Sequence, residues 1–255
     1  MPYDIDAMRK KLIQESSGLV VDLDELFRPK KNDPENLYRH ARDVIKGRWR
    51  KAEPHIMKDP HCACKYAQDV IKGRWRKAEP TIMKESASAY WYARRVIKGR
   101  WPEAEPIIMK KPSLARDYAY YVIKGRWPEA EPYIMKESYE AYYYARDVLD
   151  ERWPEAEPYI MKNPEAATSY TVCFNKRRWR AAEPYIMVNS GCAVYYAEKI
   201  IGGRWPEAEP YIMENPGYAM EYAKDVIGGR WLEAEPHIME NERVWIRYCK
   251  LFGIS

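Results

Sequence analysis

The strongest constraint on the fold is a motif, Arg-Trp-x-x-Ala-Glu-Pro-x-Ile-Met, that returns at a fixed spacing of 26 residues. No insertion or deletion interrupts the series. Periods of about 20–50 residues are typical of arrays in which each repeat buries its apolar face against its neighbours. The motif therefore predicts one elongated domain. Its tryptophans are Trp49, Trp75, Trp101, Trp127, Trp153, Trp179, Trp205 and Trp231.

The first half of each repeat has the pattern of an amphipathic helix. In the repeat that begins at Pro112, apolar residues are spaced i, i+4, i+7 and i+8, which places them on one helical face. Proline at the first helical position and glycine just past the last are expected boundaries, so we expect this helix to end at Gly125. Other repeats have serine in place of Pro112, and its hydroxyl is expected to cap the helix.

The second half of each repeat predicts a shorter helix. Trp127, Ala130 and Ile134 follow the spacing i, i+3, i+7, and Glu131 lies where the helix dipole favours negative charge. Pro132 falls too late to be a first-turn proline and removes one backbone hydrogen bond. We therefore expect this helix to begin with a kink or a 3₁₀ turn.

Together these segments predict an all-α fold, a right-handed α-solenoid of eight helix-turn-helix repeats. The tandem repeats span residues 33–239. The preceding residues 1–32 are expected to form an N-terminal helical cap, and residues 240–255 a C-terminal capping helix.

Composition narrows the functional classes. No apolar run approaches the length of a membrane span, the N-terminus does not resemble a secretory signal, and five scattered cysteines do not suggest a disulfide framework. We therefore expect a cytoplasmic protein without a membrane partner. Residues 1–100 contain 23 Lys and Arg against 14 Asp and Glu, whereas residues 101–255 contain 20 against 24. The array thus changes from basic to acidic along the chain.

The positions that do not vary are interpreted as structural. Side chains that stack neighbouring repeats should be the same in every copy, while side chains that recognise a ligand should differ. Arginine is always five residues before glutamate, as an ion pair within or between repeats would require. A row of arginines lining a phosphate-binding groove is the functional alternative. In one repeat this structural ladder consists of Arg126, Trp127, Glu131, Ile134 and Met135.

The variable positions are the candidates for recognition. The residue after the motif proline is often tyrosine, and further rings lie in the first helix, including Tyr90, Trp91 and Tyr196. Exposed tyrosine rows are enriched at protein interfaces, although rings of this kind also fill the seams between repeats. The candidate partner-binding tyrosines are Tyr133, Tyr159, Tyr185 and Tyr211.

One repeat departs from the pattern between residues 168 and 180. Arg177 replaces the usual glycine, and because arginine adopts a left-handed conformation less easily, we expect a different turn there. The change is either drift or a basic notch for a partner. The cations added to the candidate site are Lys176, Arg177 and Arg180.

The residues offer little support for catalysis or metal binding. His61, Cys62 and Cys64 are close in sequence, but their positions are occupied by other residues in other repeats and no second cysteine pair completes a zinc site. No nucleophile–histidine pairing or phosphate loop is present. We expect no enzyme activity, metal or cofactor.

Nucleic acid is the main alternative ligand. The basic first hundred residues combine cations with aromatic rings, as a groove for a single strand would. Against this interpretation, the repeated glutamates would line much of such a groove. The residues of this alternative are Arg50, Lys51, Arg76, Lys77, Arg94 and Arg95.

The motif over residues 122–136, Val-Ile-Lys-Gly-Arg-Trp-Pro-Glu-Ala-Glu-Pro-Tyr-Ile-Met-Lys, resembles tandem repeats of phage and bacterial proteins. The resemblance covers about residues 33–252. In architecture it is similar to tetratricopeptide and Sel1-like arrays, with a shorter repeat. The resemblance implies a phage-type setting in which small proteins bind host factors. We therefore expect a non-enzymatic scaffold for a protein partner, such as a host defence or regulatory factor, with nucleic-acid binding or a role as an assembly spacer as the alternatives.

Overall fold

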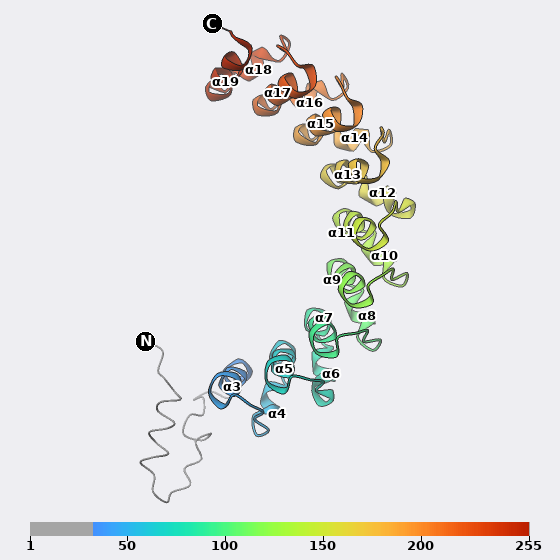
Figure 1. Cartoon of the computed structure of the whole chain (residues 1–255), viewed down its shortest axis with the longest axis vertical. Coiled ribbons are helices and arrows are strands. Elements are labelled where there is room, and N and C mark those ends of the chain that lie inside the picture. The colour runs from blue at the N-terminus through green and yellow to red at the C-terminus, as the bar shows by residue number, and fades with distance from the viewer. Residues whose placement is uncertain (1–32, 255) are drawn as a thin grey trace, which may run out of the picture. The chain divides into compact units, whose positions relative to one another are not determined.

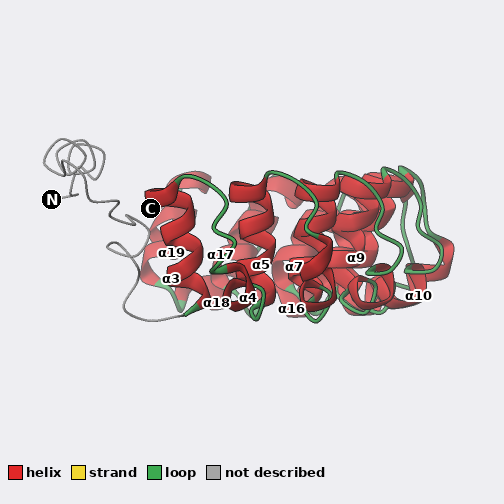
Figure 2. Ribbon diagram, turned by 90° about the horizontal axis from the view of Figure 1, so that it is seen from below, coloured by secondary structure: helices red, strands yellow, loops and turns green. Residues whose placement is uncertain are grey.

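The computed structural model describes residues 33–254, and these form an all-α solenoid without β-strands (Figure 1). The helices are joined by loops throughout this part of the chain (Figure 2). The chain divides into two compact units. Residues up to 114 together with 121–123 make the N-terminal unit, and residues 115–120 with 124 onward make the C-terminal unit. The expected cap over residues 1–32 lies outside the described residues.

Each first helix has seven α-helical residues followed directly by a π-helical turn. In chain order the α-helical parts are α3 (Pro34–His40), α5 (Pro60–Tyr66), α7 (Ser86–Tyr92), α9 (Pro112–Tyr118), α11 (Ser138–Tyr144), α13 (Pro164–Tyr170), α15 (Ser190–Tyr196), α17 (Pro216–Tyr222) and α19 (Glu242–Phe252), of which α19 is wholly α-helical. The π turns are η1 (Ala41–Ile45), η2 (Ala67–Ile71), η4 (Ala93–Ile97), η5 (Ala119–Ile123), η6 (Ala145–Leu149), η8 (Thr171–Asn175), η9 (Ala197–Ile201) and η10 (Ala223–Ile227).

Each second helix is only four or five residues long and begins at the motif glutamate. These helices are α4 (Glu53–Ile56), α6 (Glu79–Ile82), α8 (Glu105–Ile108), α10 (Glu131–Ile134), α12 (Glu157–Ile160), α14 (Glu183–Ile186), α16 (Glu209–Met213) and α18 (Glu235–Met239). Two of them follow a 3₁₀ turn, η3 (Arg76–Ala78) and η7 (Pro154–Ala156).

The short second helix changes the interpretation of the motif proline. Because α10 begins at Glu131, Pro132 lies in its first turn, where the missing N–H has no helical partner to lose. The expectation that this proline falls too late in its helix is therefore wrong. The expected 3₁₀ opening is present as η3 and η7.

Where the residue before the first helix is aspartate or asparagine, its side chain caps the helix, whereas Glu85 and Glu137 form no such bond. Asp59 accepts a hydrogen bond from the Cys62 N–H, and asparagines do the same in later repeats. The expectation that serine caps the helix is wrong, because serine is already the first helical residue. Instead the hydroxyls of Ser138 and Ser190 donate to carbonyl oxygens in the second helix of the same repeat.

The first helices end at a left-handed residue that is one position earlier than expected. Lys124 has φ 60°, while Gly125 lies outside the positive-φ region. The helix therefore ends at the residue before Gly125. In later repeats glycine occupies the left-handed position itself, as Gly202 does with φ 72°. A Cβ added to Gly125 would meet nothing within 4 Å, so a side chain is tolerated there.

Within each unit, neighbouring first helices pack side by side in one row, and the short second helices form a second row along it (Figure 1). Thus α5 packs against α3 and α7, and α15 packs against α13 and α17. Between them lies a continuous core in which Trp127, Ala130 and Ile134 are fully buried and Met135 is half-buried. At the end of the described chain, α19 packs against α17 and α18.

Candidate partner-binding surface

A repeated hydrogen-bond network joins neighbouring repeats within each unit and defines the residues that serve stability. The backbone N–H of Trp127 donates to the hydroxyl of Tyr144, at 2.6 Å, and this hydroxyl donates to Glu131 Oε1, at 3.2 Å. The same bond, always 17 residues apart, joins the tryptophan of one repeat to the last α-helical tyrosine of the next. The other pairs are Trp49–Tyr66, Trp75–Tyr92, Trp153–Tyr170, Trp179–Tyr196, Trp205–Tyr222 and Trp231–Tyr248.

The motif arginine completes this network within its own repeat. Arg126 Nε lies 2.7 Å from Glu131 Oε1 and Nη2 lies 3.0 Å from Oε2, which is the two-pronged geometry that a guanidinium and a carboxylate prefer. Half of the Arg126 side chain remains exposed, whereas only 10% of Glu131 is accessible. The arginine therefore holds a nearly buried carboxylate against the tyrosine hydroxyl. An arginine–glutamate pair of this kind is present in every repeat.

Burial of the tyrosine in this network raises its pKa. The pKa of Tyr170 rises to about 12, because its ring is fully buried and Glu157 lies next to its hydroxyl, while the Trp153 N–H opposes the shift. Tyr196 and Tyr66 behave in the same way, each with a pKa of about 12. These hydroxyls are therefore neutral at physiological pH and both donate and accept.

Residue-by-residue comparison of the repeats misses this tyrosine because the first copy is His40. From Tyr66 onward the position is always tyrosine, and this invariance marks the position as structural without showing its hydrogen-bond partner. Tyr196, grouped above with the candidate contact rings, is fully buried and belongs to this network.

The remaining variable side chains form a stripe that we call the first-helix face. It consists of positions 2, 6, 9 and 10 of each first helix, counted from the proline or serine, which share one side of a helix. Their sequence differs in every repeat. Exposed rings on or beside this face are Trp91, Tyr120, Tyr121, Tyr139, Tyr195 and Tyr218.

In the N-terminal unit this face carries two arginines set against aromatic rings. Arg94 lies 3.6 Å from the centre of the Tyr121 ring and donates to the hydroxyl of buried Tyr90. Arg95 lies over the exposed Trp91 ring at 4.5 Å. Cation–π contacts of this kind hold both guanidiniums in place.

In the C-terminal unit the face has a similar ring cluster with its charges paired. Arg146 lies 4.7 Å from the Tyr143 ring and pairs with Asp147 at 2.7 Å. Tyr139 stacks on Tyr143 and donates to Glu165 of the next repeat. These contacts link neighbouring first helices across the face.

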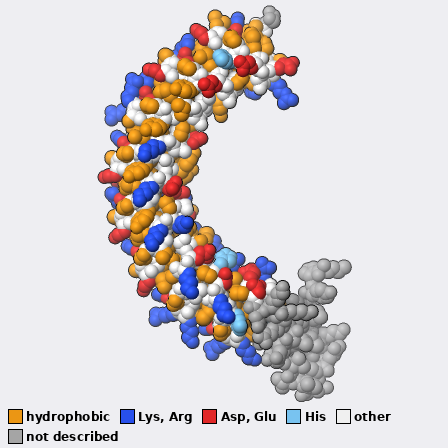
Figure 3. All heavy atoms as spheres, turned by 180° about the vertical axis from the view of Figure 1, so that it is seen from behind, with side chains coloured by type: hydrophobic (Ala, Val, Ile, Leu, Met, Phe, Trp, Pro, Cys, Tyr) orange, Lys and Arg blue, Asp and Glu red, His pale blue; other side chains and the backbone are white. Residues whose placement is uncertain are grey.

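The tyrosines predicted from the residue after the motif proline lie on the second helices. Tyr133, Tyr185 and Tyr211 are exposed and Tyr159 is half-buried. Lys136 lies 5.9 Å from the Tyr133 ring, and Lys162 lies 5.6 Å from the Tyr159 ring. Figure 3 shows hydrophobic and basic side chains alternating along one side of the molecule.

The irregular repeat keeps the usual turn. Lys176 occupies the left-handed position with φ 51°, and Arg177 follows it outside the positive-φ region. The expected change of turn is therefore wrong, because Arg177 stands where other repeats have a glycine that is not left-handed. Arg177 is exposed, and Arg180 reaches Glu183 at 3.4 Å. Trp179 is less buried than the other motif tryptophans.

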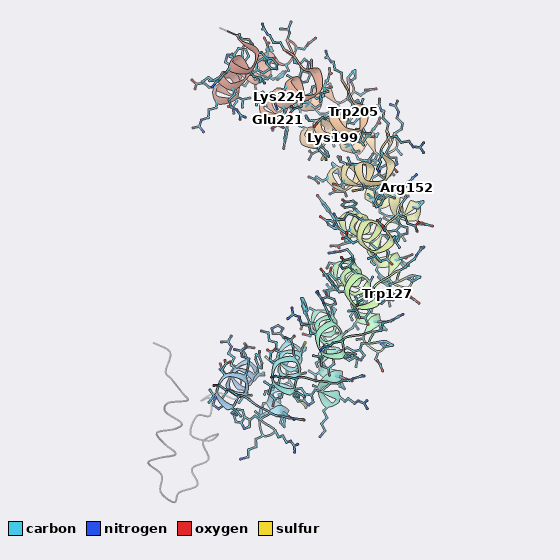
Figure 4. The ribbon with its side chains drawn as sticks, in the orientation of Figure 1. Trp127, Arg152, Lys199, Trp205, Glu221 and Lys224 are labelled. Atoms are coloured by element: carbon cyan, nitrogen blue, oxygen red, sulfur yellow. The ribbon has the colours of Figure 1, made fainter. Side chains whose placement is uncertain are left out.

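The cations of the nucleic-acid alternative belong to two separate elements. Arg50, Lys51, Arg76 and Lys77 precede the second helices, and all four are exposed. Arg94 and Arg95 lie on η4, in contact with first-helix rings. Figure 4 shows the side chains along the chain, with Lys199 and Lys224 on the first helices and Arg152 near the second.

Within residues 33–254 no group of three His, Cys, Asp or Glu side chains is placed to hold a metal ion. None of the helices described in this part of the chain has both the length and the apolar character to cross a membrane. No protein-family model, curated protein or solved structure matches this chain.

Proposed function

We propose that this protein is a non-enzymatic scaffold that binds a protein partner along its first-helix face. The observation that carries the proposal is the separation of roles within the repeat. The unvarying arginine, glutamate and tryptophan are used in joining repeats, whereas the varying positions bear exposed rings and arginines. Tryptophan, tyrosine and arginine are the residues that contribute most to binding energy at protein interfaces.

The partner's identity rests on the resemblance to phage and bacterial repeats. On that basis we propose a host regulatory or defence protein, bound in the cytoplasm. The tyrosines of the second helices make a smaller second candidate surface, to which Lys176, Arg177 and Arg180 would add charge.

A capture experiment with paired variants tests which surface binds. Tagged protein is mixed with nuclease-treated host lysate, and the stoichiometry of any recovered complex is measured. The first-helix-face variant combines Trp91→Ala, Tyr143→Ala and Tyr195→Ala. Its control combines Tyr133→Ala, Tyr185→Ala and Tyr211→Ala on the second helices.

We expect a stoichiometric complex that the first-helix-face variant loses and the control retains. Loss in the control alone would move the binding surface to the second helices. Recovery of no stoichiometric complex would contradict the proposed function.

Nucleic-acid binding remains a second candidate because of the charge of the N-terminal unit. Residues 33–114 contain 19 Lys and Arg against 10 Asp and Glu. Binding of generic single strands that weakens steeply with salt would favour it.

A further inference from the structure

In three repeats, position 9 of the first helix holds a cation and position 10 holds an aspartate that pairs with it. Arg42 pairs with Asp43 through two bonds of 2.7 and 2.8 Å, and Arg146 pairs with Asp147 in the same way. Lys224 and Asp225 repeat the arrangement at 2.9 Å. In these repeats the positive charge of the first-helix face is therefore neutralised internally.

The repeat containing α7 has a second cation at position 10 instead of an acid. Arg95 stands directly after Arg94, at the position where four other repeats have aspartate, namely Asp43, Asp69, Asp147 and Asp225. Among the ion pairs of the described residues, none includes Arg94 or Arg95. In the following repeat the same position is Tyr121, whose ring supports Arg94. The aspartate is thus missing from two successive repeats.

The surrounding rings hold the two guanidiniums ready for an anion. Arg94 is fixed between the Tyr121 ring and the Tyr90 hydroxyl, and Arg95 is fixed over Trp91. Stacking uses the flat face of a guanidinium and leaves N–H groups at its edge available to acceptors. Adjacent like charges also repel each other, and a bound anion would relieve that repulsion.

We infer that Arg94 and Arg95, with Trp91 and Tyr121, form an anchoring site for a pair of carboxylates on an acidic segment of the protein partner. This inference rests on the proposed function and names the chemistry that its first-helix face recognises. Each guanidinium would bind one carboxylate through charge-assisted hydrogen bonds, while the rings pack against the partner's apolar groups.

A local pair of carboxylates fits the face better than a continuous phosphate backbone does. The first-helix face of the two preceding repeats carries Glu35, Asp43 and Asp69 interspersed with Arg39, Arg42 and Lys65. A nucleic-acid strand that ran along this face would bring phosphates against those carboxylates. An acidic protein segment needs to place its charges only at Arg94 and Arg95.

The test compares one probe across two charge-matched variants. Fluorescein-labelled octaglutamate is titrated with the full chain at low salt, and fluorescence anisotropy gives the Kd. Arg95→Asp creates the internal pair that three other repeats contain, so the fold should be kept. Arg76→Asp makes the same change in net charge within the same unit but on an exposed side chain before α6. Circular dichroism checks that both variants remain helical.

We expect Arg95→Asp to weaken octaglutamate binding at least about tenfold, and Arg76→Asp to change it less than about twofold. An equal loss in the two variants would show attraction to net charge only and would overturn the site. Failure of the wild-type protein to bind octaglutamate at millimolar concentration would also overturn it.

A second probe separates the protein partner from nucleic acid. Single-stranded dT8 has a similar charge to octaglutamate, and we expect it to bind more weakly. Tighter binding of dT8, lost in Arg95→Asp, would overturn the inference in favour of a nucleic-acid site. The proposed function fails separately, because it depends on a stoichiometric complex that the first-helix-face variant loses.

Discussion

Removal of the Tyr144 hydroxyl is the most direct test of the hydrogen-bond network that joins neighbouring repeats. Tyr144→Phe keeps the buried ring that packs on Trp153 but removes the acceptor for the Trp127 N–H and one donor to Glu131. The Trp127 amide and its hydrogen bond to this hydroxyl are buried. Leaving a buried donor unsatisfied destabilises a protein by about 1–3 kcal/mol. We therefore expect this loss in the free energy of unfolding.

Tyr143 provides the matched control, because it is the preceding residue of the same helix and lies half-buried on the first-helix face. Tyr143→Phe should change stability by less than about 0.5 kcal/mol. The assay is urea-induced unfolding followed by circular dichroism, with thermal unfolding as a check. For a domain of this size each kcal/mol corresponds to about 2–4 °C in Tm.

Hydrogen exchange locates the effect in the chain. The Trp127 amide should exchange faster in Tyr144→Phe than in the wild-type protein, while the Trp205 amide, bonded to Tyr222, should not change. Equal stability of Tyr144→Phe and Tyr143→Phe, or unchanged exchange at Trp127, would refute the view that this hydroxyl joins the repeats.

Three further predictions test the same structure. Trp127→Ala should lower stability by about 3–5 kcal/mol through lost packing, and an unchanged Tm would show that the tryptophan row is not core. Gly228→Ala should destabilise by about 1 kcal/mol because φ is 72° there, whereas Gly125→Ala should be neutral or stabilising; urea unfolding of both distinguishes the two glycines. The contribution of the buried tyrosines to stability should be constant up to about pH 10 and fall between about pH 10 and 12, because Tyr170 ionises near 12 when folded but near 10 when unfolded. Tyrosinate absorbance and helical circular dichroism, followed together, should show ionisation of the buried tyrosines only as the helices unfold.

The all-α solenoid could be predicted from the sequence because the period and the apolar spacing act together. Trp127, Ala130 and Ile134 occupy one helical stripe and are fully buried. The ends of the first helices are harder to predict. In each Lys-Gly pair glycine adopts the left-handed conformation more easily than lysine, so the sequence favours glycine as the left-handed residue. The chain nevertheless uses Lys124 as the left-handed residue, and only Gly202 and its later equivalent show the position directly.

The tyrosine network could not be predicted from residue types because its donor is a backbone N–H. A backbone amide has no sequence signature, so the partner of Tyr144 is visible only once the repeats are stacked. The contact between Arg94 and the Tyr121 ring also could not be predicted. The two residues lie in different repeats and meet only when the repeats are stacked. The sequence does show that Arg94 and Arg95 are adjacent cations near aromatic residues, and this is the part of the candidate site that it predicts.

The backbone donor also explains how the array tolerates changes of sequence within a repeat. In the irregular repeat Thr171, Phe174 and Asn175 replace core residues, yet the Trp179 N–H still lies 2.6 Å from the Tyr196 hydroxyl. Arg178 still pairs with Glu183 at 2.8 Å. Because the join depends on the main chain, one tyrosine and one ion pair, the outward positions can change without altering how repeats stack. Such a repeat can acquire a pair of cations, as at Arg94 and Arg95, at little cost to stability.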